Sequence, residues 1–393
     1  MSGLRDATAV VGIGHTEYSK DSGRSELRLA TEAVSAALAD AGLEASEVDG
    51  LVTYTRDLVQ ETDLARAVGM GDLTFFSRIG YGGGAACAVV QQAAMAVATG
   101  AARTVVVYRA LNGRSGKRYG AGRRTGAEGS DGFESVVTWV SPSGLSTPAG
   151  WIALFARRYM HEFGATSEDF GRLSVLMRRH ASTNPDAWYF GRPITLEEHQ
   201  ASPWIVEPLR RLDCCQESDG AVALVVTSAE RARDLATAPA LIRAAAQGSG
   251  NDQHMMTSYY RAAPELAELP EVALVARQLF GAAGLAPADI DVAMLYDHFT
   301  PFVLPQLESF GFCDRGEARH LVAEGRLDLD GELPLNPHGG QLGEAYMHGV
   351  NGVVEAVRQI RGTAANQVSG AENVLVTAGT GVPTSGLILS SDQ

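Results

Sequence analysis

The chain carries one four-part pattern twice, and this repeat limits the folds that are open to it. Each copy contains an apolar helical segment, the tripeptide AGL, a short acidic turn and a β-type run; the copies are residues 31–54 and 273–296. Aligned on AGL, Asp49 falls on Asp291 and Tyr54 falls on Tyr296. Chance similarity between two alanine-rich helices is the alternative, but the shared order of four features favours a duplicated unit.

A second match supports the same interpretation. Residues 100–108, GAARTVVVY, resemble residues 370–378, GAENVLVTA, and each stretch follows an alanine- or valine-rich helical segment. Helices that alternate with β-type runs predict an α/β protein. We therefore expect two similar α/β halves at 1–235 and 236–393, with a loop subdomain inserted into the first half at about 110–212.

The composition is that of an ordinary folded protein with an acidic surface. The 393 residues include 46 acidic and 32 basic side chains, a formal net charge of −14, and 45% of them are hydrophobic. Broad attraction to nucleic acid or anionic membrane is not expected, so an anionic ligand needs a local basic patch. We read no export signal, and no stretch approaches the roughly 20 apolar residues of a membrane span. The four cysteines lack CxxC spacing, which favours a reduced, cytoplasmic protein.

Two apolar helical segments begin with glycines; they are residues 80–100 and 349–362. Backbone N–H groups are uncovered at a helix start, where the helix dipole is positive. Gly82, Gly83 and Gly84 could therefore bind a phosphate, a carboxylate or a developing oxyanion. Tyr346 and His348 lie just ahead of the second segment. The alternative is structural, since glycines also let helices pack closely and a tyrosine can simply pack at a helix start.

A nucleotide-binding interpretation of the first segment is weak. Gly80, Gly82 and Ala85 match the dinucleotide pattern G-x-G-x-x-A. That pattern also needs an acidic residue near the end of the next strand to bind the ribose. The next β-type run, TVVVYRAL, instead ends with Tyr108 and Arg109, so an oxidoreductase that uses NAD(P) is disfavoured.

At these motifs the chain resembles the thiolase superfamily, and within it the branch of lipid-transfer or sterol-carrier-type thiolases. The resemblance covers nearly the whole chain. Its most specific blocks are NPDAWYFGRPITLEEHQASPWIVEPLRRLDCCQESDGAVALVVTS at 184–227 and NPHGGQLGEAYMHGVNG at 336–352. The resemblance implies a thiolase-like five-layered fold of two pseudo-symmetric βαβαβαββ halves. It also implies acyl-CoA thioester substrates and a homodimer.

The chain departs from working thiolases at each catalytic position that the resemblance marks. The nucleophilic cysteine of the family falls on Gly83, and the histidine of its GHP motif falls on Tyr346. Tyr296 and His298 replace the histidine and the cysteine of its HDCF motif, and the C-terminal cysteine falls on or beside Thr377. Acyl transfer through a cysteine thioester is therefore excluded, although the scaffold for a thioester remains.

This pattern is similar to that of the steroid side-chain-cleaving aldolases of the lipid-transfer branch. The resemblance implies retro-aldol cleavage of a 17-hydroxy steroid acyl-CoA to a 17-ketosteroid and propionyl-CoA. Tyr296 and Tyr346 are the expected acid and base, in an order left open, and Gly82 to Gly84 are the expected donors to the thioester oxygen. No metal or nucleotide cofactor is expected, because CoA is part of the substrate. The alternative is a non-catalytic subunit that binds acyl-CoA or lipid.

Several further residues are weaker candidates. His298 and His348 could support the site or could be structural histidines, and Asp297 could orient a tyrosine or His298. Cys87, one turn inside an apolar helix, is interpreted as an inert core residue. A basic run could bind CoA phosphates, contact an acidic partner or be a solvated loop; it consists of Arg109, Arg114, Lys117, Arg118, Arg123 and Arg124. The resemblance also implies a complex with a small OB-fold protein that carries a zinc ribbon.

Overall fold

One mixed sheet runs through the molecule. The computed structural model describes residues 4–80, 82–116, 118, 140–251, 253, 267–380 and 383–392. Among them, nine strands pair in the order β3-β2-β4-β7-β1-β8-β11-β10-β9. The strands are β1 (Thr8–His15), β2 (Gly50–Tyr54), β3 (Phe75–Ile79), β4 (Thr104–Asn112), β7 (Asp219–Ser228), β8 (Ala240–Gly248), β9 (Val292–Met294), β10 (Asn373–Thr377) and β11 (Thr384–Ser391). The two halves join where β1 pairs briefly with β8.

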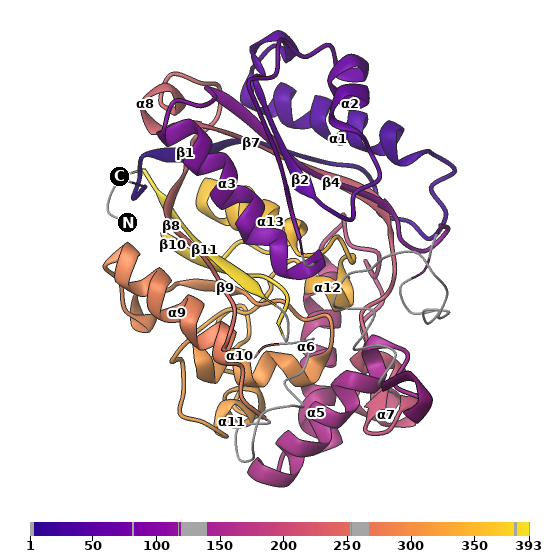
Figure 1. Cartoon of the computed structure of the whole chain (residues 1–393). Helices are drawn as coiled ribbons and strands as arrows, with labels where there is room; N and C mark the ends of the chain where they lie inside the picture. Colours follow the sequence, from indigo (N-terminus) through magenta and orange to yellow (C-terminus); the bar gives the residue numbers. More distant parts are fainter. Residues whose placement is uncertain are drawn as a thin grey trace.

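The helices make three layers that alternate with the two halves of the sheet (Figure 1). Helices α1 (Glu26–Ala41) and α2 (Glu61–Val68) cover the outside of the first half, and α9 (Pro270–Ala283) covers the outside of the second. Helices α3 (Ala86–Ala98) and α13 (Val350–Arg361) lie between the halves and pack on strands of both. Separate apolar cores fill the interfaces. The predicted five layers are confirmed.

The two halves follow the predicted βαβαβαββ order to different extents. The first half has it in full, with α1, α2 and α3 between its first four strands and β7 as the last strand. In the second half the described residues contain no counterpart of β3. A single parallel bridge between Ala293 and Leu335 lies where that strand would pair. The connection from β9 to α13 instead carries α10 (Val303–Ser309), α11 (Ala318–Ala323) and α12 (Gly340–Gly343).

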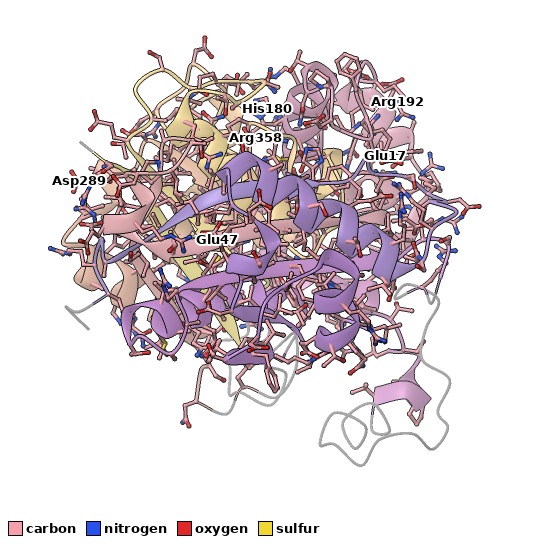
Figure 2. All side chains as sticks on the ribbon, turned by 90° about the horizontal axis from the view of Figure 1, so that it is seen from above. Glu17, Glu47, His180, Arg192, Asp289 and Arg358 are labelled. Carbon is pink, nitrogen blue, oxygen red and sulfur yellow. The ribbon has the colours of Figure 1, made fainter. Side chains whose placement is uncertain are left out.

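The repeated sequence forms the same local structure in both halves. Gly42 caps the C-terminus of α1 and Gly284 caps that of α9, with φ of 69° and 68°, values that glycine adopts without strain. A 3₁₀ turn follows each helix, and its last residue is acidic: Glu47 in one half and Asp289 in the other. Each carboxylate accepts a hydrogen bond from a backbone N–H just ahead of the turn, at 2.9 and 2.7 Å. Both turns are at the surface, since Glu47 and Asp289, which are labelled in Figure 2, are exposed.

The aligned aspartates also have one function in both halves. Asp49 accepts hydrogen bonds from the N–H groups of Arg103 and Thr104, where β4 begins, at 2.9 and 2.8 Å. Asp291 accepts the N–H of Asn373, at the start of β10, at 2.8 Å. Each aspartate therefore links the turn after AGL to the strand that follows α3 or α13. This shared contact is a structural reason why the pattern occurs twice.

An insertion separates β4 from β7. It contains α5 (Pro148–Phe163), α6 (Ser167–Thr183), α7 (Leu196–Ala201) and a two-stranded sheet of β5 (Trp204–Val206) and β6 (Leu209–Arg210). These elements lie beside the second half, at the lower right of Figure 1. The segment 214–218 leads from the insertion back to β7. In the part of the chain that the structure describes, no helix is long and apolar enough to cross a membrane.

Candidate active site

The two tyrosines selected from the sequence meet in the structure. Tyr296 follows β9, and Tyr346 lies in the loop between α12 and α13. Their hydroxyl oxygens are 3.3 Å apart, and Tyr296 donates the hydrogen bond. Tyr296 is 2% exposed, whereas Tyr346 is partly exposed. Burial, and next the Tyr346 oxygen, raise the pKa of Tyr296 well above that of a free phenol. A phenol that is held protonated thus contacts a second, more accessible phenol.

The missing side chain at Gly83 makes room for the Tyr296 phenol. A Cβ atom at Gly83 would lie 2.0 Å from the Tyr296 hydroxyl oxygen and 2.5 Å from its Cζ. Gly349, at the start of α13, contacts the same ring, because a Cβ there would lie 3.0 Å from Tyr296 Cδ2. Gly83 belongs to the 3₁₀ turn Gly82–Ala85 that leads into α3. The glycine-rich starts of both central helices therefore hold the phenol between them.

Part of the α3 start is already occupied by a protein group. The Ser385 hydroxyl accepts hydrogen bonds from the N–H groups of Cys87 and Ala88, at 3.2 and 3.0 Å, and donates to the Gly84 carbonyl at 2.7 Å. Candidate anion donors are therefore those of the turn Gly82–Ala85. Cys87 itself is completely buried, and burial raises the pKa of its thiol far above the ordinary value. The thiol is thus unsuited to be a nucleophile.

The side chains of Thr377 and Gln306 hold the Tyr296 backbone, a role that the sequence did not predict for either residue. The Thr377 hydroxyl accepts the Tyr296 N–H at 2.9 Å and donates to Gln306 Oε1 at 2.7 Å. The Gln306 amide in turn donates to the Tyr296 carbonyl at 2.9 Å. Thr377 was selected only as the place of the family's C-terminal cysteine. Gln306 lies ten positions after Tyr296, on helix α10, and no motif in the sequence marks it.

The segment 214–218 lies between the loops of the two tyrosines and binds both. The Cys215 N–H donates to the His298 carbonyl at 2.9 Å. The Tyr346 N–H donates to the Ser218 hydroxyl at 3.2 Å. The insertion therefore helps to set the distance between the two phenols through the segment that follows it.

His298 lies beside Tyr296 in an aromatic environment. Its ring centroid is 4.8 Å from that of Tyr296, 4.9 Å from that of Phe299 and 5.4 Å from that of Phe302. Among the described residues, neither ring nitrogen of His298 has a hydrogen-bond partner. Burial lowers the pKa of His298 to about 3. His298 is therefore a neutral imidazole at physiological pH.

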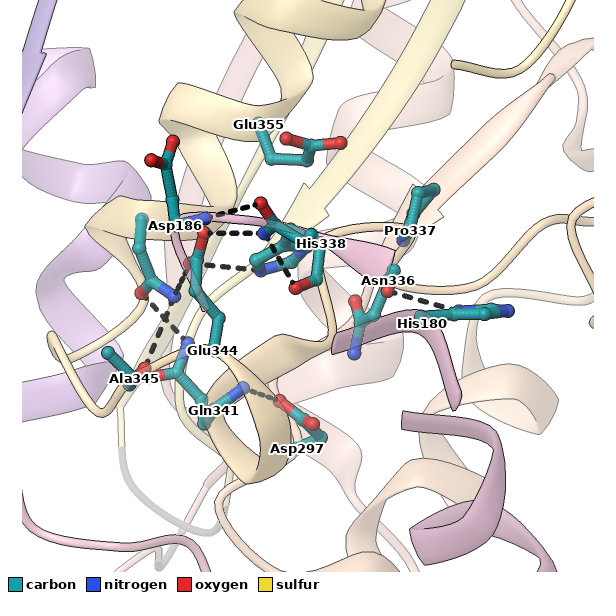
Figure 3. A network of polar contacts seen from close by, with 12 residues as sticks. His180, Asp186, Asp297, Asn336, Pro337, His338, Gln341, Glu344, Ala345 and Glu355 are labelled. Atoms are coloured by element: carbon teal, nitrogen blue, oxygen red, sulfur yellow. Dashed lines mark hydrogen bonds and ion pairs between the residues drawn. The ribbon is translucent and has the colours of Figure 1, made fainter. Parts of the chain in front are cut away.

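Asp297 could have oriented a tyrosine or His298. In the structure its side chain instead binds backbone N–H groups. Its carboxylate accepts the N–H groups of Gln341 and Leu342, at 2.6 and 3.3 Å, and so caps α12 (Figure 3). Burial raises the pKa of Asp297 to about 7. The residue links the Tyr296 loop to the helix ahead of Tyr346, because its short side chain faces the start of α12 and not the phenols.

His348 contacts the accessible phenol. The His348 and Tyr346 rings pack edge to face, with centroids 4.9 Å apart. Tyr54, the first-half counterpart of Tyr296 in the repeat, donates from its hydroxyl to the His348 carbonyl at 3.3 Å. Arg109 Nε donates to His348 Nδ1 at 3.1 Å. The structure therefore assembles Tyr296, Tyr346, His298 and His348 around the glycine-rich turn.

The basic run does not form one surface patch. Arg109, for which binding of CoA phosphates, contact with an acidic partner and a solvated loop were all left open, is 1% exposed and pairs with Asp57 at 2.9 Å. None of the three applies to it, because Arg109 lies within β4 and not in the loop after it. Arg118 pairs with Glu217 at 2.5 Å. Arg114 is partly buried, and its backbone N–H binds the Asp219 carboxylate. The remaining members, Lys117, Arg123 and Arg124, lie outside the described residues.

Two buried acidic side chains, Glu344 and Glu355, lie close to the polar network of Figure 3. Glu344 accepts a hydrogen bond from Asn351 at 2.8 Å, and Glu355 accepts one from Gln359 at 2.9 Å. Burial raises the pKa of Glu344 to about 7 and that of Glu355 to about 8. Between the ordinary carboxyl pKa and these raised values, each of the two carboxyls keeps its proton in the folded chain and has lost it in the unfolded chain. Their contribution to the free energy of unfolding therefore falls as pH rises toward and through the raised values.

We expect the melting temperature to fall between about pH 7 and pH 8.5, where histidines have largely titrated in the unfolded chain. The buried His338, whose pKa is lowered to about 3, has the opposite effect on stability, but only at lower pH. Glu355→Gln should make the fall smaller, and Glu324→Gln, at an exposed position, should leave it unchanged. Differential scanning fluorimetry across this range measures the effect. An equal fall in all three proteins would contradict the assignment.

Comparison with known proteins places this arrangement in a family. Residues 253–390 match the family model described as thiolase C-terminal domain-like. A steroid side-chain-cleaving aldolase from Thermomonospora curvata is 65% identical over 100% of both chains. The chain belongs to the thiolase superfamily, among the steroid side-chain-cleaving aldolases.

Two further relatives support this membership. The 17-hydroxy-3-oxo-4-pregnene-20-carboxyl-CoA lyase from Mycobacterium tuberculosis is 62% identical, over 98% of this chain and 100% of that protein. A solved structure described as an Ltp2-ChsH2(DUF35) aldolase superposes with a TM-score of 0.95, at 64% identity and with 99% of each chain covered. The resemblance to this branch of the thiolases, first inferred from the motifs, is confirmed.

Proposed function

We propose that this aldolase-family chain is a carbon–carbon lyase that cleaves a 17-hydroxy steroid bearing a propionyl-CoA side chain. The products are a 17-ketosteroid and propionyl-CoA. The proposal agrees with the names of two relatives that align along nearly the whole chain. The observation that carries it is the hydrogen bond between the phenols of Tyr296 and Tyr346, because the reaction needs one base and one acid close together.

The proton balance of the reaction fits a pair of phenols in contact. A base takes the proton of the C17 hydroxyl, the C17–C20 bond breaks, and its electron pair forms the enolate of the propionyl thioester. An acid then protonates the enolate carbon. One proton leaves the substrate and one returns, so no external proton source is consumed. A direct hydrogen bond lets the proton pass from base to acid after each turnover.

Within this pair, Tyr346 suits the base and Tyr296 suits the acid. The pKa of a phenol in water is about 10, so a phenolic base at neutral pH needs a donor that stabilises its phenolate form. The Tyr296 hydroxyl is such a donor, and burial keeps it protonated. Tyr346 is partly exposed, which makes it the phenol that a substrate hydroxyl can approach.

The thioester oxygen gains negative charge as the enolate forms, and the turn at the start of α3 is suited to stabilise it. Gly82, Gly83 and Gly84 offer backbone N–H groups there. A Cβ at Gly83 would contact the Tyr296 hydroxyl, so these groups lie beside the proposed acid. An enolate oxygen bound to the turn would bring the enolate close to Tyr296.

The same contact supports a loss of thiolase chemistry. If Gly83 is the former nucleophile position, the Tyr296 phenol fills the space that a cysteine side chain would use. A retro-aldol reaction changes no oxidation state overall and needs no cysteine. Proton transfer and an oxyanion site suffice, so we propose that no metal or nucleotide cofactor takes part.

Product analysis tests the proposal directly. The chain, with and without its partner, is incubated with a 17-hydroxy steroid propionyl-CoA, and the mixture is analysed by mass spectrometry. We expect equal amounts of 17-ketosteroid and propionyl-CoA. Intact substrate under both conditions, together with a thermal shift on binding, would instead favour a non-catalytic acyl-CoA-binding subunit.

The relative described as an Ltp2-ChsH2(DUF35) aldolase is named for a second component, and we propose an equivalent small OB-fold, zinc-ribbon partner for this chain. Gel filtration of the chain alone and with the protein encoded beside it tests the complex. A single chain with full activity and no stable complex would count against dependence on a partner.

The four free cysteines fit a reducing cytoplasm, where we place the complex.

We also propose that two copies associate through β3. This strand is at one edge of the sheet, and its Phe76 side chain is 66% exposed. Leu58, which is 74% exposed, follows Asp57, whose carbonyl accepts a hydrogen bond from Arg78 of β3 at 2.7 Å. An apolar edge strand favours pairing with a second copy around a two-fold axis. Phe76→Arg should therefore convert a dimer to a monomer in light scattering, and Phe190→Arg, at a 53% exposed phenylalanine elsewhere, should not. An unchanged dimer in both variants would exclude this edge.

A further inference from the structure

The largest completely buried side chain among the described residues carries a positive charge. It is Arg109, on β4, which is 1% exposed. Arginine is almost never buried in this way unless it is paired, and its partner is the equally buried Asp57 at 2.9 Å. A buried ion pair is weak evidence for a contribution to stability, because apolar residues of similar volume often serve as well. The pair therefore needs another explanation.

Arg109 is fixed by several hydrogen bonds and has one donor directed at the active site. Its Nη1 donates to Asp57 Oδ2 at 2.9 Å and to the Ala110 carbonyl at 3.1 Å. Asp57 is fixed in turn by the N–H groups of Ala110 and Val59, both at 3.0 Å. The Nε of Arg109 donates to His348 Nδ1 at 3.1 Å. The guanidinium thus connects a rigid strand of the first half to a loop of the second.

This contact determines the protonation of His348. A guanidinium has only donors, so His348 Nδ1 must accept and the ring proton must be on Nε2. Burial, and next the charge of Arg109, lower the pKa of His348 well below the ordinary value. The backbone of His348 has φ of 53°, a region that residues other than glycine rarely adopt. The loop therefore holds a strained conformation with its imidazole in one tautomer.

The fixed imidazole packs against the proposed base. The centroids of the His348 and Tyr346 rings are 4.9 Å apart in an edge-to-face contact. Tyr346 must approach Tyr296 to within a hydrogen bond and also face the substrate, so a small displacement of its ring affects both contacts. A misplacement of about 1 Å can reduce a rate on the order of 10²-fold.

We propose that Arg109, anchored by Asp57, is a positioning residue: it holds His348 as the Nε2-protonated imidazole, and that ring sets Tyr346 against Tyr296. The effect on the rate rests on the proposed lyase function. The effect on His348 does not, because its tautomer is a property of the resting protein.

The tautomer is measured first, in the unmodified protein. Nitrogen-15 NMR of histidine-labelled protein, with the His348 signals identified from a His348→Gln variant, distinguishes the two neutral forms and the cation. We expect an unprotonated Nδ1 and a protonated Nε2 at pH 7.5. A proton on Nδ1, or a cationic ring, would overturn the proposal, whether or not the chain cleaves a steroid ester.

The effect on the rate is measured in Arg109→Lys. Lysine keeps the charge but lacks the planar guanidinium whose separate N–H groups bind Asp57 and His348 at the same time. We expect kcat to fall on the order of 10²-fold with little change in KM, and the His348 signal to become a mixture of tautomers. Arg178→Lys is the matched control, since Arg178 is also buried, at 8% exposure, but its guanidinium binds the Arg192 carbonyl and packs on the Tyr189 ring, and no hydrogen bond joins it to His348, Tyr346 or Tyr296 in the described residues.

Each outcome for these variants is informative. A folded Arg109→Lys protein with normal kcat and an unchanged His348 signal overturns the proposal. Equal losses of kcat in Arg109→Lys and Arg178→Lys would assign the effect to general destabilisation and also overturn it. If the unmodified protein cleaves no substrate, the proposed function fails, whereas the NMR result still decides the role of Arg109 toward His348.

Discussion

Replacing Tyr346 with phenylalanine is expected to reduce kcat for cleavage of the 17-hydroxy steroid acyl-CoA by about 10²- to 10⁴-fold. The change removes one oxygen atom from a partly exposed ring, so the fold and the affinity for the CoA ester should be retained. The physical reason is that the C17 hydroxyl loses its proton acceptor and Tyr296 loses the oxygen to which it donates at 3.3 Å. The rate is measured by quenching the reaction at a series of times and quantifying the products by mass spectrometry.

Tyr296→Phe should lower kcat by a similar factor, because the enolate then has no adjacent acid. The double variant should be hardly slower than either single variant, since residues that act as one unit give non-additive losses. Tyr159→Phe is a suitable control, because this buried phenol lies in α5 and hydrogen-bonds to Glu308. Near-normal cleavage by both Tyr346→Phe and Tyr296→Phe would exclude the phenol pair as the catalytic groups.

Adding one methyl group at Gly83 is the second change with a large expected effect. The Cβ of Gly83→Ala would lie 2.0 Å from the Tyr296 hydroxyl oxygen, far inside van der Waals contact, so the buried phenol has to move. We expect a loss of activity on the order of 10²-fold or more, because a displacement of about 1 Å is enough to misalign reacting groups. Loss of the Tyr296–Tyr346 hydrogen bond in a crystal structure of the variant would verify the cause.

Gly80→Ala provides the matched control. Gly80 lies three positions earlier in the same glycine-rich stretch, and a Cβ there would contact nothing within 4 Å. Its activity should therefore remain close to that of the unmodified chain. Gly83→Cys should behave like Gly83→Ala and should not acquire thiolase activity, because the phenol already occupies the space of the new side chain. An active Gly83→Ala protein would show that Tyr296 is not tightly confined.

The fold could be predicted well because its main determinants are local in sequence. Each copy of the repeat contains a complete unit: a helix, a glycine that ends it, an acidic turn and a strand. The structure adds the reason for the aligned aspartates, which bind N–H groups at the starts of β4 and β10. The missing counterpart of β3 could not be predicted, since the long connection after β9 pairs through Leu335 alone in the described residues.

The members of the active site could be predicted in part. Tyr296, Tyr346 and Gly83 were selected by their positions in family motifs, and the structure brings them into contact. Arg109 was misplaced, because adjacent basic residues resembled a surface loop although β4 extends as far as Asn112. Gln306 was missed altogether.

The amino-acid sequence alone was sufficient for the duplicated α/β architecture and for the identity of the two phenols, because hydrophobic periodicity, turn residues and motif positions are written along the chain. Only the tertiary structure decided how those phenols differ. Tyr296 is buried behind Gly83 and Tyr346 remains accessible, and a charge from the first half of the chain fixes the imidazole beside Tyr346. Burial, hydrogen-bond direction and local charge arise when distant segments pack together, and they determine which phenol stays protonated.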